Sequence, residues 1–204
     1  LMAVTKTVEP IFINHAIENG IKLIGENKVQ ELLDKYDKLP EDTRWHMIGH
    51  LQTNKVKYLI GKTKLIHSVD SIKLATEIEK QASKSDTVMD ILIEVNIANE
   101  ETKFGLDDDS AKELLESEEF SQLKNIRICG LMGIGSITDD KSKTRQEFKH
   151  LRELFNCFKE KYFADCDYFS EISMGMSDDF EIAIEDEELQ PLRTLGELVE
   201  NRLY

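Results

Sequence analysis

Short apolar segments alternate with longer amphipathic segments along the whole of this sequence. Eight short segments have the length and apolar content of buried strands; they lie at residues 1–5, 23–25, 45–49, 65–69, 91–96, 126–132, 168–174 and, with a weaker pattern, 192–195. Between them, amphipathic patterning predicts helices at residues 11–18, 28–38, 52–59, 71–83, 110–116, 143–161 and 178–187. Strands that alternate with helices in this way are typical of a parallel α/β protein.

The number of strand–helix units favours a closed barrel. An open doubly wound sheet also satisfies the alternation, but eight units are what a single (β/α)₈ TIM-type barrel needs, and about 200 residues suffice for one. The chain has 204 residues and three prolines, and no low-complexity linker divides it, so we expect one domain over residues 1–204. The sequence starts inside an apolar segment, so we expect upstream residues to be missing. In a barrel, functional side chains gather where the strands end.

Composition and charge restrict the function classes. A hydrophobic fraction of 40% with 32% charged residues is typical of a soluble globular protein. Acidic residues number 40 against 26 basic ones, and the net charge of −14 argues against a nucleic-acid or anionic membrane partner. No apolar run approaches the roughly 20 residues that span a bilayer. Three cysteines without a Cys-x-x-Cys pair favour neither a disulfide framework nor a zinc site, and they fit a reducing cytoplasm.

Two strand ends carry candidate chemistry. Lys6 closes the first apolar strand, and a lysine held at a barrel mouth gains the neutral amine that forms a Schiff base with an aldehyde. The segment SMGMSDD at 173–179 places two serines and a glycine before a predicted helix, as in an anion site. Each feature has an ordinary alternative, because strand-end lysines are mostly solvated and Ser177 can simply cap a helix. Together they suggest a phosphorylated aldehyde bound as an imine.

Two other patterns are weaker. His46 and His50 have the spacing of a helical metal pair, but they lie in a strand-to-loop segment, where that spacing does not put them on one helical face. We therefore expect no metal site there. Gly133 and Gly135 could begin a dinucleotide-binding fingerprint, but Thr138 stands where its third glycine should be.

Seven motifs in order carry a family resemblance. They are LMAVTKT at 1–7, GENKVQE at 25–31, WHMIGHLQTNK at 45–55, HSVD at 67–70, VN at 95–96, GLM at 130–132 and SMGMSDD at 173–179. With them the chain closely resembles the pyridoxal 5′-phosphate homeostasis proteins, which look like the barrel domain of alanine racemase standing alone. The resemblance runs from residue 1 to about residue 187. It implies a barrel fold and pyridoxal 5′-phosphate as the cofactor, bound as an aldimine to Lys6.

The resemblance also implies a set of cofactor-binding residues, which are Lys6, Asn27, Met132, Ser173, Gly175, Met176, Ser177, Arg193 and Gly196. Asn27 would line the pocket, and Met132 would lie near the cofactor ring. The segment 173–177 would hold or flank the phosphate.

The last strand departs from the family pattern. Family members read Arg-Ile-Gly-Thr there, with the arginine near the pyridine nitrogen and the next residues on the phosphate. Arg193 fits directly, whereas Gly196 fits only with one inserted residue. Glu197 then takes the place of a hydroxyl, where its carboxylate would repel a phosphate. Family members also open with a helix before the first strand, which this sequence lacks.

The resemblance leaves two function classes open. Racemisation needs a proton donor or acceptor on each face of the carbanion, and alanine racemase takes one of them from a tyrosine beyond the barrel. This chain ends shortly after its eighth strand, and none of its five tyrosines falls at a predicted strand end. We therefore expect a non-catalytic, cytoplasmic and monomeric protein of cofactor homeostasis, with pyridoxal phosphate and cofactor-receiving apoenzymes as candidate partners. The alternatives are a small pyridoxal-phosphate-dependent amino-acid racemase and a cofactor-free Schiff-base aldolase acting on a sugar phosphate.

Overall fold

The computed structural model describes residues 2–98, 100, 104–185 and, for the course of the backbone, 192–197. Its elements are, in order, β1 (Met2–Val4), α1 (Pro10–Glu18), β2 (Leu23–Glu26), α2 (Val29–Tyr36), β3 (Arg44–Met47), the 3₁₀ helix η1 (Thr53–Tyr58), β4 (Leu65–Val69), α3 (Ile72–Lys84), β5 (Met89–Val95), α4 (Asp108–Glu116), α5 (Glu118–Ser121), β6 (Ile126–Gly133), α6 (Lys141–Tyr162), β7 (Glu171–Met174), α7 (Phe180–Glu185) and β8 (Leu192–Glu197).

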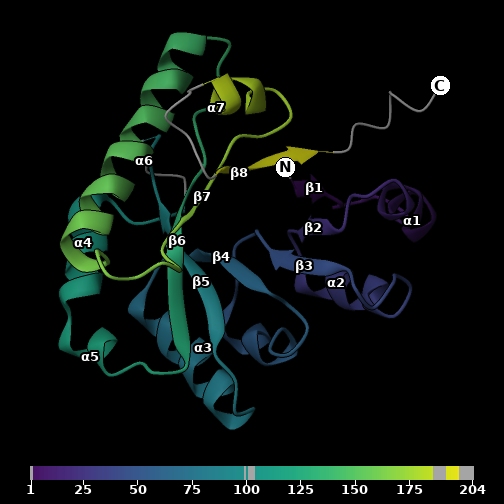
Figure 1. The fold of residues 1–204 in the computed structure, drawn as a ribbon, viewed down its shortest axis with the longest axis horizontal. Coiled ribbons are helices and arrows are strands. Elements are labelled where there is room, and N and C mark those ends of the chain that lie inside the picture. The colour runs from purple at the N-terminus through teal and green to yellow at the C-terminus, as the bar shows by residue number, and fades with distance from the viewer. Residues whose placement is uncertain (1, 99, 101–103, 186–191, 198–204) are drawn as a thin grey trace.

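The strands form one curled parallel sheet in which neighbours in the sequence are neighbours in space from β1 to β7. The backbone of β8 pairs with both β7 and β1, which closes the sheet, and the helices lie around its outside (Figure 1). The expected parallel α/β barrel architecture is therefore confirmed. A helix after β8 would fall among residues 198–204, outside the described residues, so the full count of eight strand–helix units stays a prediction.

The core has an outer and an inner part, because alternate strand residues point to opposite faces of the sheet. The outer part joins strand residues such as Ile24 and Ile93 to helix residues such as Leu32 and Leu151. The inner part consists of two clusters that contain no helix residue, and we place them in the barrel lumen. They are Met2, Val4, Leu23 and Ile48, and Leu65, Leu92, Cys129 and Met132.

Most predicted elements exist, with shifted boundaries. The segment 52–59 is a 3₁₀ helix instead of an α-helix, and α5 was not expected at all. The seventh strand begins at Glu171 and not at residue 168, because Phe169 leaves the sheet to stack between Phe155 and Phe163. The predicted helix 178–187 begins at Phe180, and its last residues lie outside the described part of the chain. No helix in that described part is long and apolar enough to cross a membrane.

Candidate functional site

An open pocket lies at the carboxyl ends of β1, β2, β6 and β7. It encloses about 490 Å³ of space, part of which is open solvent. The residues that line it include Val4, Lys6, Asn27, Ile48, Gly133, Ile134, Gly135, Gly175, Met176 and Asp179. Apolar groups make most of this wall, so the few polar groups determine what the pocket can bind.

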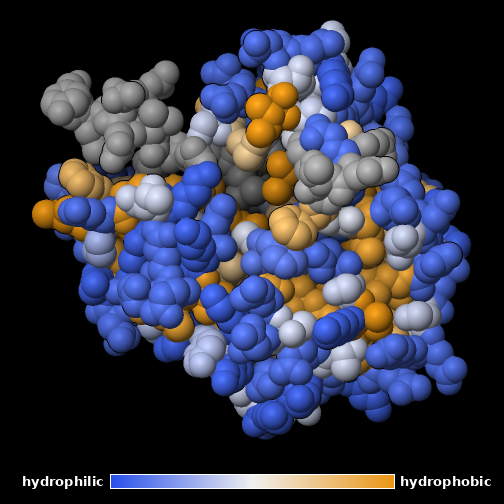
Figure 2. Space-filling model, turned by 180° about the vertical axis from the view of Figure 1, so that it is seen from behind, coloured by the Kyte–Doolittle hydropathy of each residue, from blue (hydrophilic) through white to orange (hydrophobic). Residues whose placement is uncertain are grey.

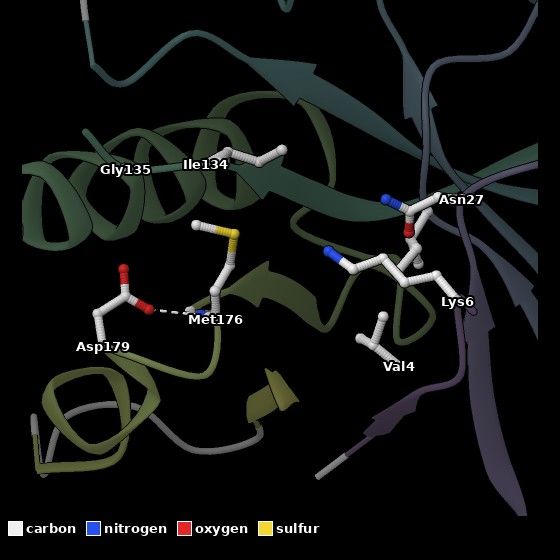
Figure 3. Close-up of a pocket in the computed structure, with 10 residues that line it drawn as sticks. Val4, Lys6, Asn27, Ile134, Gly135, Met176 and Asp179 are labelled. Carbon is white, nitrogen blue, oxygen red and sulfur yellow. Dashed lines mark hydrogen bonds between the residues drawn. The ribbon is translucent and has the colours of Figure 1, made fainter. Parts of the chain in front are cut away.

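Lys6 is the cationic group among these residues. It is half-buried in a turn two residues after β1, so it follows the strand instead of closing it. Its amine extends into the pocket, with Asn27 beside it and Ile134 and Met176 across from it (Figure 3). A primary amine at a partly apolar pocket is suited to bond a carbonyl compound.

Asn27 brings an amide group next to Lys6. Its Oδ1 is buried and has no hydrogen-bond partner among the described residues, which leaves an unused acceptor beside Lys6. The backbone of Asn27 is held by close packing, since a Cβ on Gly49 would lie only 2.3 Å from the Asn27 carbonyl oxygen. The glycine in the segment after β3 is thus what lets the two chain segments meet.

The opposite wall comes from the ends of β6 and β7. Gly175 has a φ of 86°, a conformation that favours glycine, and it turns the chain from β7 towards α7. Asp179 accepts a short hydrogen bond from the Met176 N–H within this turn (Figure 3). Burial raises the pKa of Asp179, although the Met176 N–H opposes that rise. A carboxyl group therefore faces the pocket beside the predicted phosphate-binding segment.

Three predicted site residues lie near the pocket without lining it. Met132 is fully buried in the barrel lumen. The Ser173 hydroxyl is buried too, and it lies 2.9 Å from His67 Nδ1. Ser177 is partly exposed in the turn before α7. The pocket brings together the other predicted residues whose side chains are described: Lys6, Asn27, Gly175 and Met176.

The two predicted residues of β8 are placed only by backbone register. Arg193 pairs with Ser173, and Gly196 pairs with Ala3. Glu197 pairs with Val4, which lines the pocket, so the backbone of Glu197 lies close to it. The side chains of these β8 residues lie outside the described part of the structure.

The histidines of the third and fourth motifs separate in the fold. His46 and His67 lie in the lumen, with His46 Nδ1 2.8 Å from His67 Nε2, and His67 continues to Ser173. His50 is exposed and stacks on Phe104 with 4.1 Å between ring centroids. Within the described ranges, no group of three or more His, Cys, Asp or Glu side chains is arranged to hold a metal ion.

Comparison with known proteins identifies the family. The alanine racemase N-terminal domain family matches residues 1–193. A pyridoxal phosphate homeostasis protein of Aquifex aeolicus is 46% identical over 187 residues, which are 91% of this chain and 80% of that protein. This chain belongs to the pyridoxal phosphate homeostasis protein family. The resemblance seen in the seven motifs is thereby confirmed.

Solved structures with similar sequences have the same fold. PipY of Synechococcus elongatus without PLP (pyridoxal phosphate) superimposes with a TM-score of 0.85 at 29% identity, covering 96% of this chain and 89% of that one. PipY with PLP bound gives a TM-score of 0.83 at 29% identity, covering 96% and 90%. The match to these solved structures therefore extends over nearly the whole chain.

Sequence reasoning missed part of the pocket wall. Gly133 at the end of β6 and Ile134 and Gly135 directly after it line the pocket, although the two glycines had been considered as a failed dinucleotide motif and not as cofactor-binding residues. A Cβ on Gly133 would lie 2.9 Å from Ile97 Cδ1 and from Leu151 Cδ2, so close packing explains this glycine. Two glycines at the end of a buried strand were the available signal. Nothing in the pattern pointed to Asp179 as a lining residue, because an acidic residue there also fits a helix start.

Glu94 is a buried carboxyl group on β5. It is 4% exposed on β5, and its Oε2 has no partner among the described residues. Burial, assisted by the Asp70 carboxylate, raises the pKa of Glu94 to about 7. The folded protein therefore holds a proton on Glu94 at pH values where an unfolded chain has released it.

We predict that this proton makes stability fall as pH rises. Between the ordinary pKa of 4.5 and about 7 the folded state binds the extra proton, so the free energy of unfolding decreases with pH across this window. The loss amounts to about 3 kcal/mol, as an order of magnitude. Urea unfolding at pH 4 and pH 8 should show Glu94→Gln gaining about this much relative to wild type at the higher pH. An unchanged difference between the two pH values, or the same gain in the exposed control Glu113→Gln, would contradict the assignment.

Proposed function

We propose that this chain binds pyridoxal 5′-phosphate in the pocket around Lys6, as an aldimine of the Lys6 amine, and takes part in cofactor homeostasis without catalytic turnover. The observation that carries the proposal is the position of Lys6. It is the cation among the described lining residues, in a chain similar to PipY, whose structure has been solved with PLP bound. The bound cofactor would supply an aldehyde for the amine and an electron-accepting ring.

The residues present fit such a ligand. The buried, unpartnered Oδ1 of Asn27 offers an acceptor beside Lys6, and Val4, Ile48 and Ile134 offer apolar surface for a flat ring. The ring would approach Met132 from the pocket side. A mostly apolar wall suits an aromatic aldehyde better than an open-chain sugar phosphate, because a sugar phosphate needs partners for its hydroxyl groups. The pocket therefore disfavours a cofactor-free aldolase.

We assign the phosphate to the turn after β7. Ser173, Gly175, Met176 and Ser177 would hold or flank it, together with Gly196 on β8. The Met176 N–H is already donated to Asp179, so other donors of this turn must carry most of the binding. Asp179, and Glu197 if it faces the pocket, weaken phosphate binding by charge repulsion, which suits a protein that also has to release its cofactor.

The pocket favours a carrier over a racemase. Asp179 is the only titratable group besides Lys6 among the described lining residues, and none of these is a tyrosine. Arg193, proposed beside the pyridine nitrogen, would keep that nitrogen unprotonated, because a permanent positive charge opposes a second one nearby. An unprotonated ring is a poorer electron acceptor and supports carbanion chemistry weakly.

The setting we propose is the cytoplasm, with the protein as a monomer that gives cofactor to apoenzymes. The three cysteines are free thiols, as expected in a reducing compartment. The net charge of −14 opposes self-association as well as binding to anionic surfaces. Hydrophilic side chains cover most of the face shown in Figure 2, with apolar surface visible between them.

The first prediction from this proposal concerns the attachment site. Lys6→Ala should abolish the borohydride-stable cofactor adduct and the visible absorbance of the imine, because no other described lysine lines the pocket. Far-UV circular dichroism should show the variant to be folded. Lys28→Ala, which removes an exposed lysine next to Asn27, is the control and should keep the adduct. Peptide mapping of an adduct to Lys28 or Lys55 would disprove the assignment.

The second prediction concerns the phosphate. Pyridoxal 5′-phosphate should bind more tightly than 5-deoxypyridoxal, which carries the same aldehyde without the phosphate. Hydrogen bonds to a charged group contribute about 1.5–3 kcal/mol each, so the loss of two implies an affinity ratio of roughly 100-fold or more. Fluorescence titration of both compounds measures this ratio. Equal affinities would rule out a phosphate site at 173–177.

The third prediction concerns turnover. Amino acids added to the cofactor-loaded protein should at most shift its spectrum, with racemisation and transamination no faster than with free cofactor. The reason is the lack of a suitable second proton donor on the described pocket wall. Chiral chromatography of alanine and other amino acids after long incubation tests this. Steady turnover that disappears in Lys6→Ala would establish the racemase alternative instead.

A further inference from the structure

A buried ion cluster lies beneath the turn that carries Lys6. Lys35 on α2 donates to three acceptors: Glu26 Oε1 at 2.8 Å, Glu31 Oε1 at 2.7 Å and the Thr5 carbonyl at 2.6 Å. These bonds use all three donors of the ammonium group. The side chains of Lys35 and Glu26 are 8% and 0% exposed, so water cannot replace either one as the partner of the other.

The cluster holds both neighbours of Lys6. On one side, Thr5 donates its hydroxyl to Glu26 Oε1 at 2.7 Å and offers its carbonyl to Lys35. On the other side, the Thr7 N–H donates to Glu31 Oε1 at 2.5 Å. The peptide groups before and after Lys6 are therefore both hydrogen-bonded to the same ion cluster, which consists of Glu26, Glu31 and Lys35.

Thr7 has a constrained backbone conformation. Its φ is 63°, a left-handed conformation that a β-branched residue rarely adopts. Such a conformation persists only where surrounding contacts enforce it. Glu31 supplies one of these contacts, beside two hydrogen bonds within the turn, from the Val8 N–H to the Thr5 carbonyl and from the Thr7 hydroxyl to the Lys6 carbonyl. Burial opposes ionisation of Glu31, but the hydrogen bonds from Lys35 and from the Thr7 N–H outweigh burial and lower the pKa of Glu31.

We infer that Glu26, Glu31 and Lys35 are positioning residues for Lys6, which aim its amine into the pocket by clamping the turn from Thr5 to Thr7. This inference rests on the proposed function in one respect, namely that the amine bonds the cofactor aldehyde. Reactions between two held groups are sensitive to displacements of about 1 Å, so a loose turn should slow the reaction of Lys6 much more than it weakens the fold.

Four variants of the protein test the clamp. Glu31→Ala removes the acceptor of the Thr7 N–H, and Glu31→Gln restores an acceptor oxygen of the same reach. Lys35→Met removes the buried ammonium but keeps a side chain of similar length. Leu32→Ala is the control: this fully buried residue of α2 belongs to the apolar core, so its loss lowers stability without touching the turn.

Two measurements are made on each variant at a temperature where it is folded. The first is amide hydrogen exchange of Thr7 in the cofactor-free protein. The second is the rate at which the imine absorbance appears on mixing with pyridoxal 5′-phosphate. We expect Glu31→Ala and Lys35→Met to exchange Thr7 at least tenfold faster and to form the imine roughly tenfold to a hundredfold more slowly. Glu31→Gln and Leu32→Ala should stay close to wild type in both.

The outcomes separate this inference from the proposed function. If wild type forms an imine at Lys6 and the clamp variants form it at the same rate, or if Leu32→Ala slows it equally, positioning is refuted. If wild type forms no imine at all, the proposed function fails, and the exchange of Thr7 alone decides whether the cluster clamps the turn. Should Lys35→Met not fold, Glu31→Ala and Glu31→Gln still give the comparison, because Glu31 is partly exposed.

Discussion

Parallel strands cannot be joined by tight turns, so each strand from β1 to β7 leads into a crossing segment that returns outside the sheet. The carboxyl ends of the strands consequently meet at one rim, and every loop that follows a strand opens there. Lys6, Asn27, Ile134 and Met176 come from four such loops, and the sheet order places β1 beside β2 and β6 beside β7. The direction of the strands thus selects which parts of the sequence can form a site.

The buried polar side chains, in the lumen and between the sheet and the helices, are stabilised in different ways. Glu26 faces α2, and its Oε1 accepts hydrogen bonds from Lys35 and Thr5; these bonds oppose the effect of burial, which still raises the pKa of Glu26. Glu94 lies on β5 without such bonds, and burial raises its pKa to about 7. His46 and His67 satisfy one another and Ser173 in a chain across the lumen. Each arrangement lowers the same free-energy cost, which is that of placing a charge or a dipole in a medium of low dielectric constant.

Much of the fold followed from the sequence pattern, and the failures have local causes. The strand predicted at 65–69 matches β4, and Lys6 was picked out because it follows the first apolar strand. The segment 168–170 was assigned to a strand because it is aromatic, but Phe169 stacks on Phe163 at 4.2 Å between ring centroids. Aromatic residues have a high strand propensity whether they lie in a sheet or pack against a helix, so the sequence could not distinguish the two.

The candidate site, too, could be predicted from the sequence only in part. The sequence by itself determined the alternation of strands and helices, the family, and the residues that follow strands, because periodicity and motifs are local properties of the chain. Only the tertiary structure decided which of these residues share a pocket. It placed Asp179 on the pocket wall and turned the Ser173 hydroxyl towards His67. It also connected Lys35 directly to the peptide group before Lys6, and through Glu31 to the peptide group after it. The hydrogen bonds from Thr7 to Glu31 and between Ser173 and His67 join residues 24 and 106 positions apart, and they depend on how the strands are staggered around the barrel, which no local pattern encodes.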